Sequence, residues 1–187
     1  MIHHEQTKPV HRILILGSDQ LNRKLPESFD TQHDLVYLNE ADIEIAGLQV
    51  HKQRILMYLA AMRHLKADLE KDGIRLLYHS VSQPVQNNSQ RTVTDLIHEL
   101  NKLHPQKLAC IRPGSYDALD KLQTVARKMK LPLEIIEDSS FFITPSEFSE
   151  WATDKKRHRQ EFFYRWMRKR FGVLMDNPDT HRSGMEF

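Results

Sequence analysis

Polar side chains follow four apolar segments that have the length and composition of buried strands. The first two groups are Gly17-Ser18-Asp19-Gln20 and Glu40-Ala41-Asp42. Two later groups are Arg112-Pro113-Gly114-Ser115-Tyr116 and residues 137–142. Ligands of an open parallel sheet bind at the carboxyl ends of its strands, near the point where the strand order reverses. Acids, amides and hydroxyls dominate here, and they suit a neutral, polyhydroxylated ligand better than phosphate. Alternatively, Asp19 and Glu40 cap the helix or turn that follows.

A basic, aromatic segment lies near the end of the chain. Between Lys155 and Arg170 there are eight Lys or Arg residues, together with His158 and a single acid, Glu161. At 3.6 residues per turn, one side of a helix there carries Phe162, Phe163, Trp166 and Met167, while Arg165, Arg168 and Lys169 fall mostly elsewhere. Such a charge asymmetry indicates contact with nucleic acid, a solvated helix face, or ion pairs with a partner domain.

The familiar catalytic and metal-binding motifs are absent. The eleven histidines include no H-E-x-x-H pattern, and the single cysteine, Cys110, lies in an apolar run typical of a buried thiol. There is no G-x-G-x-x-G, no G-x-x-x-x-G-K-S/T and no G-x-S-x-G. We therefore predict a ligand-binding domain without a catalytic residue and without a metal site.

The elements that must position these residues alternate between strands and helices. Apolar runs predict strands at residues 11–17, 34–40, 74–79, 107–112 and 131–136. Amphipathic spacing predicts helices at residues 50–71, from 92 onward, and at 117–130, with Asp72-Gly73 ending the first of them. This alternation is typical of a doubly wound α/β domain with a five-stranded parallel sheet. Beyond Glu137 it stops, and helices are predicted from Pro145 through Trp151 and roughly from Asp154 to Phe171.

The composition is that of an ordinary globular protein. The chain has 187 residues, a net charge of +2 and 40% hydrophobic residues. No apolar run approaches the roughly 20 residues that span a bilayer, and the first residues do not resemble a secretory signal. We therefore expect a cytoplasmic protein that does not bind membranes.

Several motifs together resemble the deoxyribodipyrimidine photolyase-related family, which comprises the iron–sulfur bacterial cryptochromes and prokaryotic (6-4) photolyases. The most specific is Glu161-Phe162-Phe163-Tyr164-Arg165, which continues through Met167-Arg168 to Gly172 and Leu174-Met175-Asp176. The others are Leu16-Gly17 with Asp19-Gln20-Leu21, Glu40, His51-Lys52-Gln53-Arg54-Ile55, Ala61-Met62-Arg63-His64, Pro113-Gly114, and Glu137-Asp138 leading into Phe141. The resemblance spans nearly the whole chain from about Arg12. Ser18 departs from it, because the family usually passes directly from the glycine to the aspartate.

The resemblance implies a Rossmann-like photolyase N-terminal domain with strand order 3-2-1-4-5 and C-terminal helices. It divides the chain into an antenna domain at residues 1–143, a helical extension at 144–176, and a linker at 177–187 toward a missing FAD-binding helical domain. That domain would hold the FAD and a 4Fe–4S cluster, and the longer protein would repair pyrimidine photoproducts in damaged DNA with light. This chain would hold the antenna chromophore, 6,7-dimethyl-8-ribityllumazine, and would not itself be catalytic. The implied cofactor-binding residues are Gly17, Asp19, Gln20, Glu40 and Lys52, and those implied to contact nucleic acid or the other domain are Arg159, Arg165 and Arg168.

Two other functions remain open from the sequence. One is a stand-alone nucleotide- or ligand-binding module of the universal-stress-protein type, although the segment after the fourth strand is short for a phosphate loop. The other is a non-catalytic nucleic-acid-binding protein that uses the basic helix, whose binding would fall steeply with salt.

Overall fold

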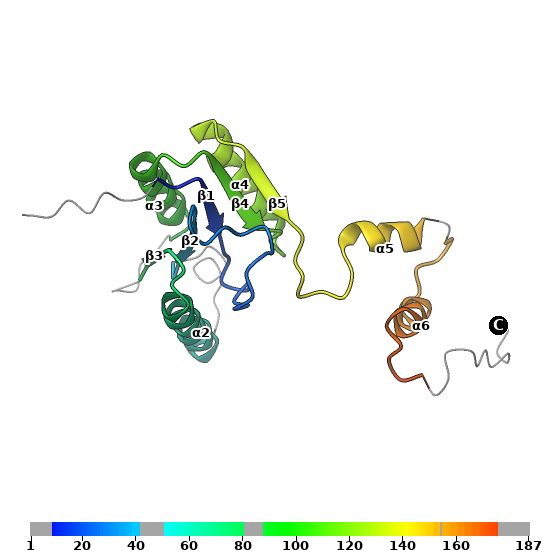
Figure 1. Ribbon diagram of the computed structural model, residues 1–187. Helices are drawn as coiled ribbons and strands as arrows, with labels where there is room; N and C mark the ends of the chain where they lie inside the picture. Colours follow the sequence, from blue (N-terminus) through cyan, green and yellow to red (C-terminus); the bar gives the residue numbers. More distant parts are fainter. Residues whose placement is uncertain (1–8, 42–50, 81–87, 154, 176–187) are drawn as a thin grey trace, which may run out of the picture. The chain divides into compact units, whose positions relative to one another are not determined.

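The computed structural model describes residues 9–41, 51–80, 88–153 and 155–175. The chain forms two compact units, Met1–Ser140 and Phe141–Phe187. Each unit is described by itself (Figure 1). The predicted linker at 177–187 and the predicted polar residue Asp42 lie outside the described residues.

A five-stranded parallel sheet forms the centre of the first unit. Its strands are β1 (Arg12–Ile15), β2 (Asp34–Asn39), β3 (Leu76–His79), β4 (Lys107–Ile111) and β5 (Leu133–Ile136). Their order is β3-β2-β1-β4-β5, and Leu14 of the central strand is in register with Val36 and Ala109. The predicted doubly wound α/β class and its strand order are therefore confirmed.

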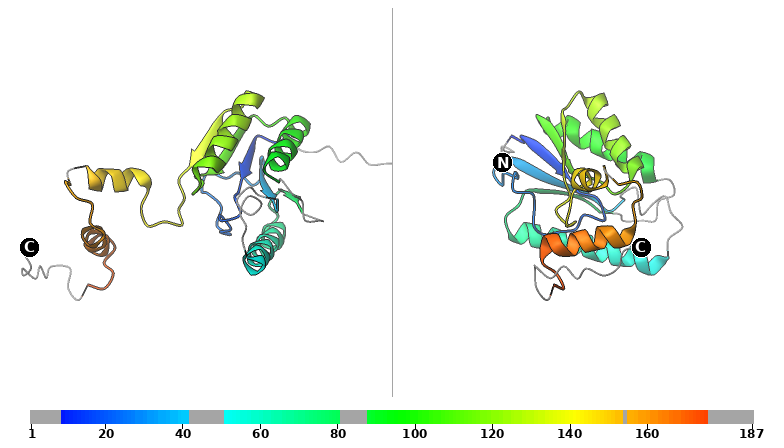
Figure 2. Two further views of the ribbon diagram at one scale, coloured as in Figure 1. Left: turned by 180° about the vertical axis from the view of Figure 1, so that it is seen from behind. Right: turned by 90° about the vertical axis from the view of Figure 1, so that its right-hand side faces the viewer.

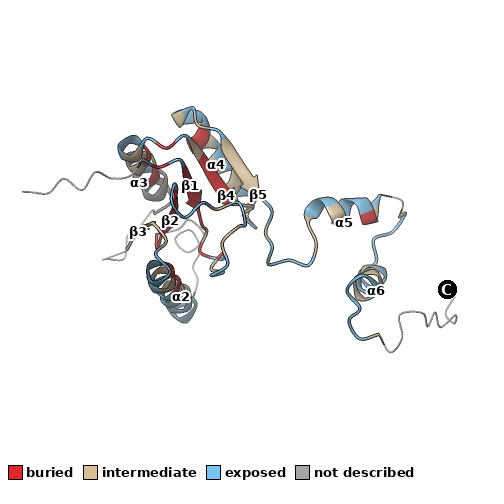
Figure 3. Cartoon of the chain, viewed as in Figure 1, coloured by how far each residue is buried: buried red, intermediate tan, exposed pale blue. Residues whose placement is uncertain are grey.

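Helices cover both faces of this sheet (Figures 1 and 2). Helix α2 (Lys52–Lys71) packs through Met62, Leu65 and Leu69 on one face. Helices α3 (Asn88–Leu103) and α4 (Tyr116–Met129) cover the other, where their buried residues include Leu96, Leu100, Val125 and Ala126. The buried residues concentrate in the central strands (Figure 3). Each fully buried aliphatic side chain stabilises the fold by about 1.5–3 kcal/mol, so this layered core holds the sheet edges in fixed positions.

The first crossover, residues 16–33, contains no helix. Its apolar residues Leu21, Leu25 and Phe29 instead pack on the face that α2 partly covers. The guanidinium of Arg12 holds the far end of this crossover by donating to Asp34 and to Ser28. Because Arg12 and Asp34 are only 3% and 1% exposed, each buried charge has its partner within the same structure.

Two helices make up the described part of the second unit. Helix α5 (Pro145–Ala152) begins with a capping box between Thr144 and Glu147, as its sequence predicts. Helix α6 (Gln160–Phe171) begins six residues later than the predicted start near Asp154. The difference has a local cause: Lys155 Nζ donates to Trp151 O at 2.7 Å and the His158 ring lies 3.2 Å from Ala152 O. These side chains bind the carbonyl groups at the end of α5, and the chain turns before α6 begins.

An aromatic cluster joins α5 and α6. Trp151 is 8% exposed, and its ring centroid lies 5.0 Å from Phe163 and 6.2 Å from Trp166. Phe148 packs edge-on against Phe163 at 5.3 Å. Phe162 differs from expectation, because it lies at the margin of the predicted stripe and is 46% exposed, beside the Arg159 guanidinium. Gly172 ends α6 at a φ of 63°, a backbone conformation that glycine adopts without steric cost.

Candidate functional site

The turn after β1 is fixed to the end of β4 by one side chain. Gln20 Nε2 donates to Ile111 O at 3.1 Å and to Arg112 O at 3.0 Å, while its Oε1 accepts from Gly17 N at 3.0 Å. Strands β1 and β4 are neighbours whose connections run in opposite directions, so this is the reversal point of the sheet. Gln20 is 7% exposed and its polar atoms are used within the protein. We conclude that Gln20 shapes this edge and offers little to a ligand.

Asp19 is the exposed carboxylate of the same turn. A Cβ added to Gly114 would lie 3.6 Å from Asp19 Oδ2, so the turn after β1 and the segment after β4 meet closely. Among the described residues, the Asp19 side chain has no hydrogen bond or ion pair. Arg112, the cation of the facing segment, is held by Glu137 at 2.7 Å. Asp19, Arg112 and Glu137 together carry one net negative charge, which disfavours an anionic ligand group at this edge.

Glu40 lies one strand away in a different environment. Its side chain is fully buried, and its Oε1 accepts from Arg63 Nε at 2.7 Å and from the Tyr78 hydroxyl at 2.6 Å. The second carboxylate oxygen accepts from Arg63 at 3.2 Å. Burial and then the hydrogen bond to Glu40 raise the pKa of Tyr78, and the same carboxylate raises the pKa of Arg63. Glu40 thus ties α2 and β3 to the end of β2.

Lys52 lies at the start of α2, away from Glu40. Arg63, which reaches Glu40, is eleven residues further along the same helix, and at 1.5 Å per residue this separation is about 16 Å. The first turns of α2 therefore extend past the level of Glu40. Leu56 and Met57 on these turns are 67% and 59% exposed. Of the five predicted cofactor-binding residues, Gly17, Asp19 and Gln20 lie together. Glu40, which is tied to α2, and Lys52 each lie apart from them.

The three arginines predicted to contact nucleic acid or another domain are engaged within the second unit. Arg165 pairs with Glu161 at 2.6 Å along α6. Arg168 donates to Val173 O at 3.3 Å and lies over the Tyr164 ring, and Arg159 lies over Phe162. Exposed ion pairs of this kind are weak, so they leave the arginines able to exchange partners. Their predicted contacts stay a prediction.

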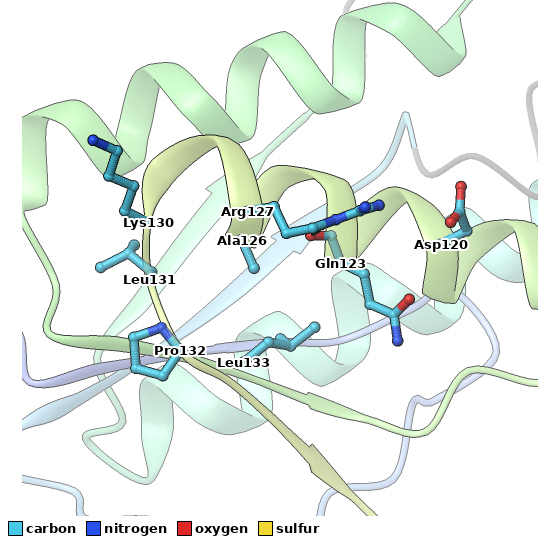
Figure 4. Close-up of a pocket in the computed structure, with 8 residues that line it drawn as sticks. All are labelled: Asp120, Gln123, Ala126, Arg127, Lys130, Leu131, Pro132 and Leu133. Atoms are coloured by element: carbon cyan, nitrogen blue, oxygen red, sulfur yellow. Dashed lines mark hydrogen bonds between the residues drawn. The ribbon is translucent and has the colours of Figure 1, made fainter.

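A groove of about 670 Å³ lies between α4 and β5 (Figure 4). Its lining is Asp120, Gln123, Ala126, Arg127, Lys130, Leu131, Pro132 and Leu133. None of the predicted site residues lies in it. Among the described residues, no cluster of three or more His, Cys, Asp or Glu side chains could hold a metal ion. Within the same part of the chain, every helix is too short or too polar to cross a membrane.

Comparison with known proteins places this architecture in a family. The model of the deoxyribodipyrimidine photo-lyase-related proteins matches residues 13–184, nearly the entire chain. The chain belongs to this family. It is similar to a (6-4) photolyase of Agrobacterium fabrum (strain C58 / ATCC 33970), with 28% identity over 166 residues. The match covers 88% of this chain but 32% of that protein, so this photolyase-related chain spans about a third of its relative's length.

Arg63 and Tyr78, which both donate hydrogen bonds to Glu40, were not among the predicted site residues. Arg63 lies eight residues after Ile55 and four after Leu59, so the helical repeat places it at the edge of the inner face of α2. A charge at such an edge is a usable sequence signal for a pair with the sheet. Tyr78 offered no comparable signal, because its proximity to Glu40 follows from the pairing of β2 with β3, which places Leu38 opposite Tyr78.

Proposed function

We propose that this chain is the light-harvesting part of a longer photolyase-related flavoprotein, and that it binds 6,7-dimethyl-8-ribityllumazine at the carboxyl ends of the strands. The observation that carries the proposal is the rigid turn at the β1–β4 reversal point, where Gln20 is fixed by three hydrogen bonds and Asp19 is exposed. Family membership supports the same assignment.

The residues at this edge fit such a ligand. A ribityl chain carries several hydroxyl groups, and a carboxylate such as Asp19 accepts hydrogen bonds from them. A bicyclic ring also needs apolar or aromatic walls, and the exposed apolar side chains on the first turns of α2 are available for this role. When bound, the lumazine would supply absorption of near-ultraviolet or blue light and transfer of the excitation to a flavin.

The parts played by the individual residues differ. Asp19 contacts the ligand, whereas Gly17 and Gln20 hold the turn that carries it, because the Gly17 N–H donates to Gln20 Oε1 and Gly17 O accepts from Gln20 N. Glu40 acts indirectly, because its carboxylate oxygens are occupied by Arg63 and Tyr78 and anchor the helix that carries Lys52. Lys52 contacts only the end of the ligand that lies farthest from Asp19.

The FAD, the 4Fe–4S cluster and the chemistry of DNA repair belong, on this proposal, to the rest of the longer protein. Four thiolates are needed to hold such a cluster, whereas Cys110 is the chain's single cysteine and is buried in β4. The exposed aromatic and arginine side chains of α6 would contact that other domain or the damaged DNA. The longer protein would be a cytoplasmic flavoprotein.

Binding of the lumazine to the purified chain tests the proposal. We expect weak but saturable binding, measured by fluorescence anisotropy, and no light-driven repair by this chain alone. Asp19→Asn weakens the binding, because the amide is a poorer acceptor of hydroxyl hydrogen bonds. The matched control is Glu27→Gln, which changes an exposed carboxylate at the far end of the first crossover, beside Ser28, and leaves binding unchanged. Absence of saturable binding by the wild-type chain would refute the proposed function.

A further inference from the structure

Tyr116 is the most exposed large hydrophobic residue in the described part of the chain. It is the first residue of α4, and it is 83% exposed. Ser115, immediately before it, caps the helix through a hydrogen bond from Ala118 N. The backbone that carries the ring is therefore fixed, while the ring itself has no covering among the described residues. An aromatic ring held in this way is available for stacking.

The position of Tyr116 relates it to the proposed ligand site. A Cβ added to Gly114 would lie 3.6 Å from Asp19 Oδ2, so Gly114 is close to that carboxylate. Tyr116 follows two residues later, and the Cα atoms of Gly114 and Tyr116 are therefore within about 7 Å of each other. The Asp19 carboxylate and the backbone that carries the Tyr116 ring thus lie on the same part of the sheet edge, at its reversal point. Both are carried by fixed backbone, since Gln20 holds the turn with Asp19 and the Ser115 cap holds the start of α4.

We infer that Tyr116 forms one wall of the antenna site by stacking on the ligand's heteroaromatic ring, while Asp19 accepts hydrogen bonds from its ribityl hydroxyls. This inference rests on the proposed function and adds a specificity: the site takes a ribityl-substituted planar ring and discriminates against a phosphorylated one. Asp19 repels a phosphate, and the neighbouring Arg112–Glu137 pair carries no net charge, so these three side chains together stay negative.

Three probes separate these contributions: 6,7-dimethyl-8-ribityllumazine, riboflavin, and flavin mononucleotide, which is riboflavin with a terminal phosphate. The wild-type chain is expected to bind riboflavin several-fold more tightly than flavin mononucleotide, and Asp19→Asn to narrow that ratio. Tyr116→Phe keeps the stacking surface and should bind the lumazine like the wild type. Tyr116→Ala removes it and should weaken binding roughly tenfold, as the loss of an aromatic stacking platform does elsewhere.

Controls make the result specific to position 116. Tyr164→Ala removes another exposed tyrosine, on α6, and should leave binding unchanged. Circular dichroism should give the same melting temperature for Tyr116→Ala and the wild type, because the ring is exposed.

The outcomes separate the inference from the proposed function. If the wild type binds the lumazine and Tyr116→Ala binds it equally well, the role of Tyr116 is refuted and the antenna proposal stands. If Tyr116→Phe is as weak as Tyr116→Ala, stacking is refuted in favour of a contact through the hydroxyl. If the wild type binds none of the three probes, both proposals fall.

Discussion

Removing the hydroxyl of Tyr78 tests the conclusion that Glu40 anchors α2 and β3 to the sheet edge. In Tyr78→Phe, Glu40 Oε1 loses its 2.6 Å hydrogen bond from the Tyr78 hydroxyl and keeps the 2.7 Å hydrogen bond from Arg63 Nε. Hydrogen bonds to charged groups contribute about 1.5–3 kcal/mol, and the carboxylate here is buried away from water that could replace the donor. Because Tyr78 itself is only partly buried, we expect the free energy of unfolding to fall by about 2 kcal/mol.

Urea denaturation and thermal melting measure this loss. For a chain of 150–250 residues, 1 kcal/mol corresponds to about 2–4 °C in Tm, so the expected decrease is about 4–8 °C. Tyr116→Phe is the matched control, since it removes a tyrosine hydroxyl from an 83% exposed ring of the same unit and should leave Tm unchanged. Equal stability of Tyr78→Phe and the wild type would contradict the anchoring role.

The same contact predicts a dependence on alkaline pH. Burial and the neighbouring carboxylate raise the pKa of Tyr78 above its ordinary value of 10.0. Its contribution to stability is therefore complete below pH 10, where the phenol is neutral in both states. Above pH 10 the unfolded chain loses the proton first, so stability falls as the pH rises toward the pKa of the folded state. Between pH 9 and 11, the free energy of unfolding of Tyr78→Phe should therefore fall less steeply than that of the wild type, as measured by urea denaturation.

Three further predictions follow from other buried groups. Gln20→Ala removes three hydrogen bonds and should lower the free energy of unfolding by about 2–3 kcal/mol, while Asp19→Asn leaves it unchanged. A urea midpoint of Gln20→Ala equal to that of the wild type would contradict the fixed turn. Burial raises the pKa of Cys110 to about 11, so Ellman's reagent at pH 8 should react only with unfolded chain, and rapid labelling of the native protein would refute this. Trp151→Ala should abolish the near-ultraviolet circular dichroism of the aromatic cluster that joins α5 and α6, whereas Phe162→Ala preserves most of it. An unchanged spectrum in Trp151→Ala would show that the cluster is not ordered around Trp151.

Local patterns were sufficient to predict the fold class. The apolar runs from Ile13 to Leu16 and from Leu35 to Leu38 are buried and supply most of β1 and β2. The helical repeat of α2 through Met62, Leu65 and Leu69 faces the sheet as expected. These features depend on spacing along the chain, which the sequence contains directly. The start of α6 was less predictable, because side-chain contacts to the end of α5 interrupt an otherwise helical sequence.

The sequence by itself determined the α/β architecture, the strand order implied by its family resemblance, and the kinds of polar side chain gathered at one edge of the sheet. Only the tertiary structure decided which of those side chains remain available to a ligand. Gln20 and Glu40 are occupied by partners on β4, α2 and β3, whereas Asp19 and Tyr116 are exposed. The physical reason is that a polar group's availability depends on neighbours distant in sequence, and strand pairing and helix packing bring those neighbours into reach.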